Sequence, residues 1–229
     1  MKPMQRVQFG NFEAVEIPGQ PGGQTVLMLH GYGADAMDLA PLGQMLRSTP
    51  GTRWIFLDGP FQIPLGLGQM GRAWFEIPAS RLQQMMMGQP MSFEDLNPPG
   101  MTEMAAQIQE TLSREKVDPG KLILAGFSQG AMIATELAMH LSVSPLGLCL
   151  LSSTCVNRPV WAREAKARVG QKYFQSHGVS DPVLPIEGAR KLDRLLQDAG
   201  WVGGLVEFEG GHEIPQYILE SLGEFLISL

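Results

Sequence analysis

The stretch from Lys121 to His140 constrains the fold more than any other part of the sequence. It opens with the apolar run Leu122-Ile-Leu-Ala125, which is typical of a strand buried on both faces of a parallel sheet. It continues as Gly126-Phe-Ser-Gln-Gly130, the Gly-x-Ser-x-Gly pattern in which a serine stands at a sharp strand-to-helix turn. Good helix formers dominate the residues that follow, so a helix can begin directly after the turn. Strand, turn and helix in this order predict an α/β fold with Ser128 above the edge of its sheet.

Ser128 is a candidate nucleophile because of this position. The backbone of such a turn is strained and neighbouring side chains would clash, so glycine is needed on both sides of the serine. The turn also places the hydroxyl at the positive end of a helix dipole, which favours developing negative charge. The same pattern occurs in plain glycine-rich turns, and a lone serine is a poor nucleophile. Catalysis by Ser128 therefore depends on finding an acid and a histidine elsewhere in the chain.

Size and composition describe one ordinary globular domain. The 229 residues suffice for one sizeable core and are few for two independent domains. The net charge is −6 and no cluster of Lys and Arg stands out, so nucleic acid is not an expected partner. Cys149 and Cys155 form neither a disulfide framework nor a metal-ligand spacing, and reduced thiols fit a cytoplasmic protein best. The N-terminus lacks the apolar core of a signal peptide and no apolar run could span a bilayer, so no stable membrane insertion is expected.

Strands and helices alternate along the chain, with no internal repeat and no linker. Strands are predicted at 25–30, 54–57, 122–125, 146–151, 173–175 and 205–208, with one or two edge strands in 7–17. Helices are predicted at 36–47, 101–115, from 131 onward, 187–199 and 215–227, with a short helix or loop at 158–168. This alternation predicts a single α/β domain over residues 1–229, built on a mostly parallel central sheet flanked by helices.

Residues 61–100 interrupt the alternation. The segment holds several glycines and prolines, and half of the 14 methionines lie between Met70 and Met104. Residues 85–87 are all methionine, so one helical face cannot bury all three. Methionine is flexible and polarizable, which suits irregular cores and adaptable binding surfaces. Two interpretations stay open: a long surface excursion with some core filling, or a lid or acyl-chain groove.

Four histidines compete for the role of general base. His140 lies late in the helix after Ser128 and is interpreted as structural, and His30 is expected to brace its own loop. His177 also follows a predicted strand and is the main rival. His212 follows the last predicted strand in a Gly-Gly-His loop, where small neighbours let an imidazole reach outward. We predict His212 as the base and His177 as a hydrogen-bonded loop residue.

The acid should lie at the carboxyl end of a strand, where ligand groups gather in open parallel sheets. Asp181 follows a predicted strand and precedes a helix, and Pro182 fixes the backbone next to it. Asp193 and Asp198 fall on a helix and are interpreted as solvated, and Asp118 as a turn residue. We therefore predict Asp181 as the acid, in the chain order Ser, Asp, His.

An oxyanion hole completes such a site, and it needs two backbone N–H groups aimed at the developing charge. One should come from Gln129, the residue after the nucleophile. The other should come from the loop after an early strand, and His30-Gly-Tyr-Gly33 fits that place, with Tyr32 N–H as the candidate.

Five motifs occur together and in order: His30-Gly-Tyr-Gly-Ala-Asp35, Arg72-Ala-Trp-Phe-Glu-Ile77, Gly126-Phe-Ser-Gln-Gly-Ala-Met132, His177-Gly-x-x-Asp-Pro-Val-Leu-Pro185 and Gly211-His-Glu213. Nearly from end to end the chain resembles the phospholipase/carboxylesterase family of α/β hydrolases, which includes the acyl-protein thioesterases. The resemblance implies Ser128 as nucleophile, Asp181 as acid and His212 as base, with Tyr32 and Gln129 as oxyanion donors. No metal and no organic cofactor is expected for this chemistry.

The resemblance also implies that the stretch 61–74 borders the acyl pocket, with Trp74 on the substrate side. We place Gly31, Met132 and Leu184 beside the substrate as well. Two features depart from the family. Leucine is common where Tyr32 stands, a change that keeps the N–H donor and can reshape the pocket mouth. The insert from 81 to 99 has no close counterpart, so a preference for acyl-chain length does not carry over.

These observations predict a serine hydrolase that cleaves carboxylic esters or thioesters through an acyl-enzyme. The substrate is expected to be a small-molecule or lipid-like acyl ester, and short esters, lysophospholipids and S-acylated proteins stay open. A non-catalytic binding protein on the same scaffold would be expected to miss a member of the triad, and none is missing. A peptidase would usually carry a larger accessory domain, and a dienelactone-type hydrolase commonly has cysteine in place of Ser128. The low charge and the apolar insert make a homodimer plausible.

Overall fold

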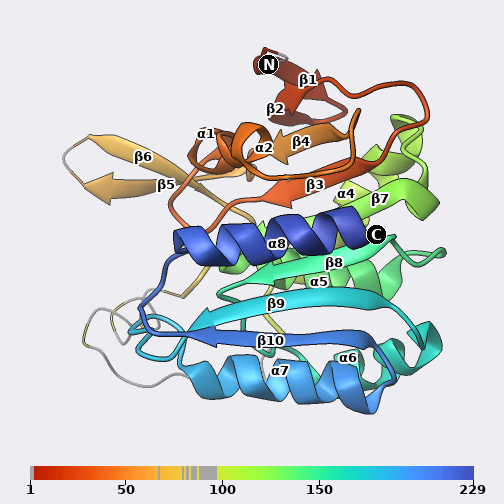
Figure 1. Ribbon diagram of the computed structural model, residues 1–229. Helices are drawn as coiled ribbons and strands as arrows, with labels where there is room; N and C mark the ends of the chain where they lie inside the picture. Colours follow the sequence, from red (N-terminus) through yellow and green to blue (C-terminus); the bar gives the residue numbers. More distant parts are fainter. Residues whose placement is uncertain (1–2, 67, 79, 81–82, 84–86, 88–96) are drawn as a thin grey trace.

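The computed structural model is built on an eight-stranded sheet with the strand order β1-β2-β4-β3-β7-β8-β9-β10 (Figure 1). It describes residues 3–229 except 67, 79, 81–82, 84–86 and 88–96. The strands of this sheet are β1 (Gln5–Phe9), β2 (Phe12–Ile17), β3 (Thr25–Leu29), β4 (Arg53–Leu57), β7 (Leu122–Phe127), β8 (Gly147–Leu151), β9 (Lys172–Gly178) and β10 (Val202–Phe208). Strands β3, β4, β7, β8, β9 and β10 pair in parallel, and β1 and β2 add an antiparallel edge. The predicted mostly parallel sheet is confirmed.

Helices cover both faces of the sheet, as parallel strands with apolar residues on both faces require. The helices of the larger core are α4 (Met101–Arg114), α5 (Gln129–His140), α6 (Arg158–Glu164) and α7 (Ile186–Asp198). The opposite face carries α1 (Ala36–Leu39) and α8 (Gln216–Ser228), and α8 crosses the middle strands in Figure 1. Successive residues of β3 alternate between the two cores, with Leu27 and Leu29 in one and Val26 and Met28 in the other. Two layers of helices around one mostly parallel sheet make this a three-layered α/β fold, as predicted.

Several elements differ in extent from the prediction. The helix expected at 36–47 is two short helices, α1 and α2 (Leu42–Met45), with Pro41 between them. Proline at this position removes a backbone donor, which favours a break. Strands β9 and β10 are longer than predicted and take in polar residues and Gly203-Gly204. One 3-10 turn, Pro119–Lys121, precedes β7. Another, Ala165–Arg168, follows α6.

The segment after β4 leaves the main sheet and forms a separate hairpin. Strands β5 (Phe61–Gly66) and β6 (Gln69–Ala73) pair with each other in antiparallel fashion. Figure 1 shows this hairpin projecting beyond the end of the sheet where the arrowheads of β3, β9 and β10 point. Most of the insert at 81–99 lies outside the described residues, so the choice between a surface excursion and a lid or acyl groove stays open there. None of the described helices combines the length and the apolarity that crossing a membrane requires.

Candidate active site

Ser128 occupies a strained turn between β7 and α5. Its φ and ψ are 54° and −118°, a backbone conformation that residues other than glycine rarely adopt. The Ser128 N–H donates to Leu151 O at 2.9 Å, which ties the turn to the end of β8. A hydroxyl held in this way lies at the N-terminus of α5, where the helix dipole favours negative charge.

The two glycines beside Ser128 are required by close backbone packing. A Cβ added at Gly126 would lie 2.4 Å from the carbonyl carbon and oxygen of Gly130, and one added at Gly130 would lie 2.2 Å from Leu29 O. Both distances are shorter than any Cβ tolerates, and the opposing atoms are backbone. The first turn of α5 therefore packs directly on the end of β3, next to the loop that begins at His30.

Asp181 and His212 form a hydrogen bond between two loops at the carboxyl end of the sheet. The Nδ1–H of His212 donates to Asp181 Oδ2 at 2.6 Å, and the Asp181 side chain is fully buried. The His212 ring packs against Phe127 with 4.9 Å between ring centroids, which places it beside the residue that precedes Ser128. The three residues that sequence reasoning selected thus come from the ends of β7, β9 and β10 and gather on one edge of the sheet.

The environment of Asp181 favours its ionised form. Burial alone would raise the pKa of its carboxyl, but hydrogen bonds from His177 and His212, the charge of His212 and the Leu184 N–H outweigh it and hold the pKa well below its ordinary value. Oδ1 accepts from the N–H groups of Val183 at 2.8 Å and Leu184 at 2.9 Å. A carboxylate that stays ionised can hold an imidazole in one tautomer and stabilise its cation.

The two loops expected to form an oxyanion hole adjoin at Ser128. A Cβ added at Gly31 would lie 3.4 Å from Ser128 Cβ and 3.1 Å from the Phe127 ring, so the loop after β3 runs alongside the turn at Ser128. Gly33 N–H donates to Arg72 O at 2.8 Å. Among the described residues, neither Tyr32 N–H nor Gln129 N–H has a hydrogen-bond partner. Two free N–H groups beside a serine can bind an oxygen that gains negative charge.

Comparison with known proteins decides the family. The phospholipase/carboxylesterase family matches this chain over residues 11–229. The chain belongs to that family. It is a hydrolase of the esterase class, as the resemblance predicted.

Relatives and solved structures agree with this assignment. Acyl-protein thioesterase 1 of Saccharomyces cerevisiae is 28% identical over 191 residues, which cover 79% of this chain and 80% of the yeast protein. The carboxylesterase of Bacillus cereus superposes with a TM-score of 0.72 at 20% identity, covering 95% of this chain and 94% of that one. A carboxylesterase from Mesorhizobium loti gives a TM-score of 0.73 at 18% identity, covering 97% and 98%. At these identities the two structures support the fold alone.

The loop of His30 in this family member is braced as predicted. The His30 Nδ1–H donates to Gly31 O at 2.7 Å, and Nε2 accepts from Gly59 N–H at 2.9 Å, so the ring is a neutral tautomer with both nitrogens in use. Burial lowers the pKa of His30, against smaller opposing effects of the Gly31 carbonyl and nearby aspartates. A histidine bonded in this way cannot act as the base.

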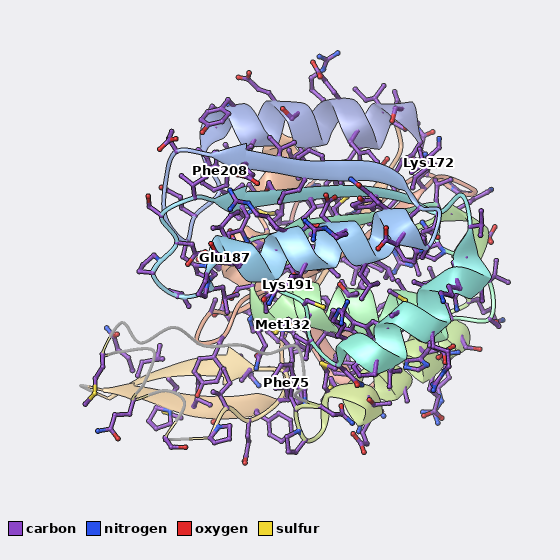
Figure 2. All side chains as sticks on the ribbon, turned by 90° about the horizontal axis from the view of Figure 1, so that it is seen from below. Phe75, Met132, Lys172, Glu187, Lys191 and Phe208 are labelled. Atoms are coloured by element: carbon purple, nitrogen blue, oxygen red, sulfur yellow. The ribbon has the colours of Figure 1, made fainter. Side chains whose placement is uncertain are left out.

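The Gln129 side chain joins α5 to the segment that leaves the hairpin, a role that the sequence did not reveal. Its Oε1 accepts from Trp74 N–H at 2.9 Å and its Nε2 donates to Phe75 O at 2.8 Å. The Trp74 indole N–H donates to His30 O at 2.8 Å. Phe75 and Met132 lie near the base of the hairpin in Figure 2. These bonds connect both predicted oxyanion loops to residues 74–75.

The four residues predicted to contact substrate are buried in the structure: Gly31, Trp74, Met132 and Leu184. Trp74 is fully buried and packs on His30 with 5.1 Å between ring centroids, so it supports the loop from within the core. Substrate contact by these residues stays a prediction.

Other predicted roles can be compared with the structure. His140 pairs with the buried Glu136 at 3.0 Å, a structural contact. Asp193, expected to be solvated, accepts from the buried Tyr173 hydroxyl at 2.6 Å. Within the residues that the structure describes, no three His, Cys, Asp or Glu side chains converge as a metal site would require.

Proposed function

We propose that this protein hydrolyses carboxylic esters or thioesters with Ser128 as nucleophile, His212 as general base and Asp181 as the acid that orients it. The observation that carries the proposal is the 2.6 Å hydrogen bond from His212 Nδ1 to Asp181 Oδ2, with His212 against the residue next to Ser128. Because Nδ1 carries the proton in that bond, Nε2 has the lone pair that a general base needs. Strain at Ser128 and burial of Asp181 both support a catalytic role.

Acylation follows from these positions. His212 Nε2 takes the Ser128 hydroxyl proton while the serine oxygen attacks the acyl carbonyl. The tetrahedral oxyanion is bound by Tyr32 N–H and Gln129 N–H, which are unpaired among the described residues. When the intermediate collapses, the bond from the former carbonyl carbon to the leaving oxygen or sulfur breaks. The alcohol or thiol leaves with the proton from His212.

Deacylation repeats the sequence with water. His212 takes a proton from water, the hydroxide attacks the acyl-enzyme, and Ser128 leaves as the alcohol with the proton returned to it. No step requires a metal or an organic cofactor. Because His212 must be neutral at both stages, the rate falls as the pH drops and the imidazole becomes protonated.

Acyl esters or thioesters with a lipid-like chain are the proposed substrates. Support comes from the exposed apolar side chains of the hairpin, Phe61, Leu65 and Met70, and from the names of the relatives, one of them a thioesterase. Leu65 lies over the loop of the predicted oxyanion donor, since a Cβ added at Gly33 would lie 3.3 Å from its Cδ2. Cys149 and Cys155 are both buried thiols that are not joined in a disulfide, which fits the cytoplasmic location proposed from the sequence.

Hydrolysis of p-nitrophenyl esters from acetate to palmitate, with matched acyl thioesters, tests the proposal. The Ser128→Ala variant should lose nearly all turnover, about a thousandfold or more, and should keep its free energy of unfolding to within about 1 kcal/mol. An optimum at medium or long chains would favour lipid or acyl-protein substrates, and one at acetate or butyrate would favour small esters. A thioester rate that exceeds the ester rate at equal chain length would assign the thioesterase activity.

Retention of most activity by Ser128→Ala would overturn the assignment of the nucleophile. Absence of Ser128-dependent turnover at every chain length, for esters and thioesters alike, would favour the alternative of a binding protein on a hydrolase scaffold.

A further inference from the structure

A second histidine contacts the same oxygen of Asp181 as His212 does. His177 is the penultimate residue of β9, is fully buried, and has its Nε2 at 3.2 Å from Asp181 Oδ2. The sequence placed this residue in a loop after the strand, and that placement was wrong because β9 extends through Gly178, three residues beyond the predicted end. Its predicted hydrogen bonding is confirmed.

The contacts of His177 fix its tautomer. Nε2 lies 2.7 Å from Leu184 O, and because a carbonyl oxygen only accepts, Nε2 must carry the hydrogen. This single N–H donates to Leu184 O, and Asp181 Oδ2 lies 3.2 Å from the same nitrogen. Nδ1 is buried and has no partner among the described residues, so a second N–H on the ring would find no acceptor there. The ring is therefore a neutral donor.

His177 also connects the two ends of the loop that carries the acid. From β9 it contacts both Asp181 and Leu184, and Leu184 N–H in turn donates to Asp181 Oδ1. The same loop is attached to the loop of His212, since Ser180 N–H donates to Gly210 O at 3.0 Å. Displacing the His177 ring would thus remove its contact with Asp181 Oδ2 and leave the carboxylate less firmly held.

We propose that His177 is a positioning residue that holds Asp181 and shares its Oδ2 with His212, and so sets how strongly the acid binds the protonated base. This inference rests on the proposed function and deepens it. A donor on Oδ2 withdraws part of the negative charge that His212 faces. Removing the donor leaves that charge to His212 alone, and the imidazolium is then bound more strongly. An enzyme that lacks the His177 donor therefore needs a higher pH to keep His212 neutral.

Other charged groups around this pair must stay constant in the test. Glu207 of β10 is opposite His177 in the sheet and is paired with Arg190 of α7 at 2.7 Å. Glu213 lies one residue from His212, with its Oε1 on Gly211 N–H. All three remain in every variant below, so their effects cancel in the comparison.

Two amide substitutions separate the donor from the rest of the ring. Glutamine can place its amide nitrogen near the position of Nε2, and asparagine can reach only the position of Nδ1. His177→Gln should keep the pH profile of kcat/KM. His177→Asn and His177→Leu should move its acid limb to higher pH by about half a unit to one unit. They should also lower kcat by about tenfold, with a smaller change in KM.

Each outcome decides the inference. An acid limb that stays in place in all three variants, or moves equally in His177→Gln and His177→Asn, would show that His177 only fills the core.

Should the variants fail to fold, NMR of the ¹⁵N-histidine-labelled wild type decides instead. His177 should show a single N–H, at Nε2. An Nδ1–H signal would overturn the inference. Loss of the Ser128 dependence of wild-type turnover would instead overturn the proposed function, so the two failures can be told apart.

Discussion

Single atoms determine the turn at Ser128. The serine accepts a φ of 54°, and the glycines beside it remove side chains that would strike backbone atoms. Gly130 is the more constrained of the two, because its Cα faces Leu29 O and His30 O across the join between α5 and β3. Gly204 in β10 is a contrast, since a Cβ added there meets nothing within 4 Å. The same residue type is thus essential at one position and replaceable at another.

Gly130→Ala should therefore destabilise the protein and damage the site, and Gly204→Ala should not. A Cβ at 2.2 Å from Leu29 O forces the backbone apart, at a cost of about 1–3 kcal/mol or more. For Gly204→Ala the change should be at most a gain of about 1 kcal/mol, from reduced freedom of the unfolded chain. Urea unfolding and ester turnover measured on both variants check this. Equal stability of the two would contradict the packing argument.

Between elements, hydrogen bonds attach the hairpin to the site. The N–H of Arg72 donates to Ala34 O and Gly33 N–H donates to Arg72 O, so β6 runs beside the loop after β3. Beyond β6, the Gln129 side chain takes both polar groups that residues 74–75 offer. The hairpin is therefore joined to both predicted oxyanion loops, and its position affects the geometry of the N–H donors.

Gln129→Ala tests this connection. The substitution keeps the backbone N–H of residue 129 but leaves Trp74 N–H and Phe75 O buried without partners, at about 1–3 kcal/mol of stability. We expect kcat/KM to fall about tenfold or more through misplaced donors. Gln175→Ala is the matched control: Gln175 is equally buried and bonds Ala189 O, away from these loops. It should lose stability without loss of kcat/KM. A Gln129→Ala enzyme with wild-type kcat/KM would refute the connection.

How much the sequence predicted depends on how local each signal was. The turn at Ser128 was predictable because strand, glycines and helix are contiguous from Leu122 to His140. Long-range contacts were not: nothing in the sequence shows that Gln129 meets Trp74 and Phe75, residues more than fifty positions away. The hairpin was missed because Pro64 and the glycines of its strands obscure the alternation. The end of β9 was missed because its residues are polar although buried.

The whole molecule is organised by the central sheet, whose middle strands are covered on both faces. All five residues of β8 are buried, and Cys149 at its centre faces the core under α8. Burial raises the pKa of the Cys149 thiol far above its ordinary value. The thiol can ionise readily only when the chain unfolds, which links this side chain to the stability of the entire fold.

The sign of that linkage predicts a loss of stability at alkaline pH. The folded pKa of Cys149 is raised, so its contribution is complete below the unfolded pKa, about 8.5, and is lost as the pH rises toward the folded value. Above about pH 9 the unfolded state gains about 1.4 kcal/mol per pH unit from this one thiol.

Cys149→Ala should lower stability by a constant amount near pH 7 and should flatten the decline between pH 9 and 10 by that slope. Tyr173→Phe is the control, because the phenol, whose pKa burial also raises, ordinarily titrates at about 10 and should change the slope between pH 9 and 10 much less than the thiol does. Urea titrations from pH 7 to 10 give the free energies of unfolding. Parallel declines for wild type and Cys149→Ala would show that the thiolate is tolerated in the folded core.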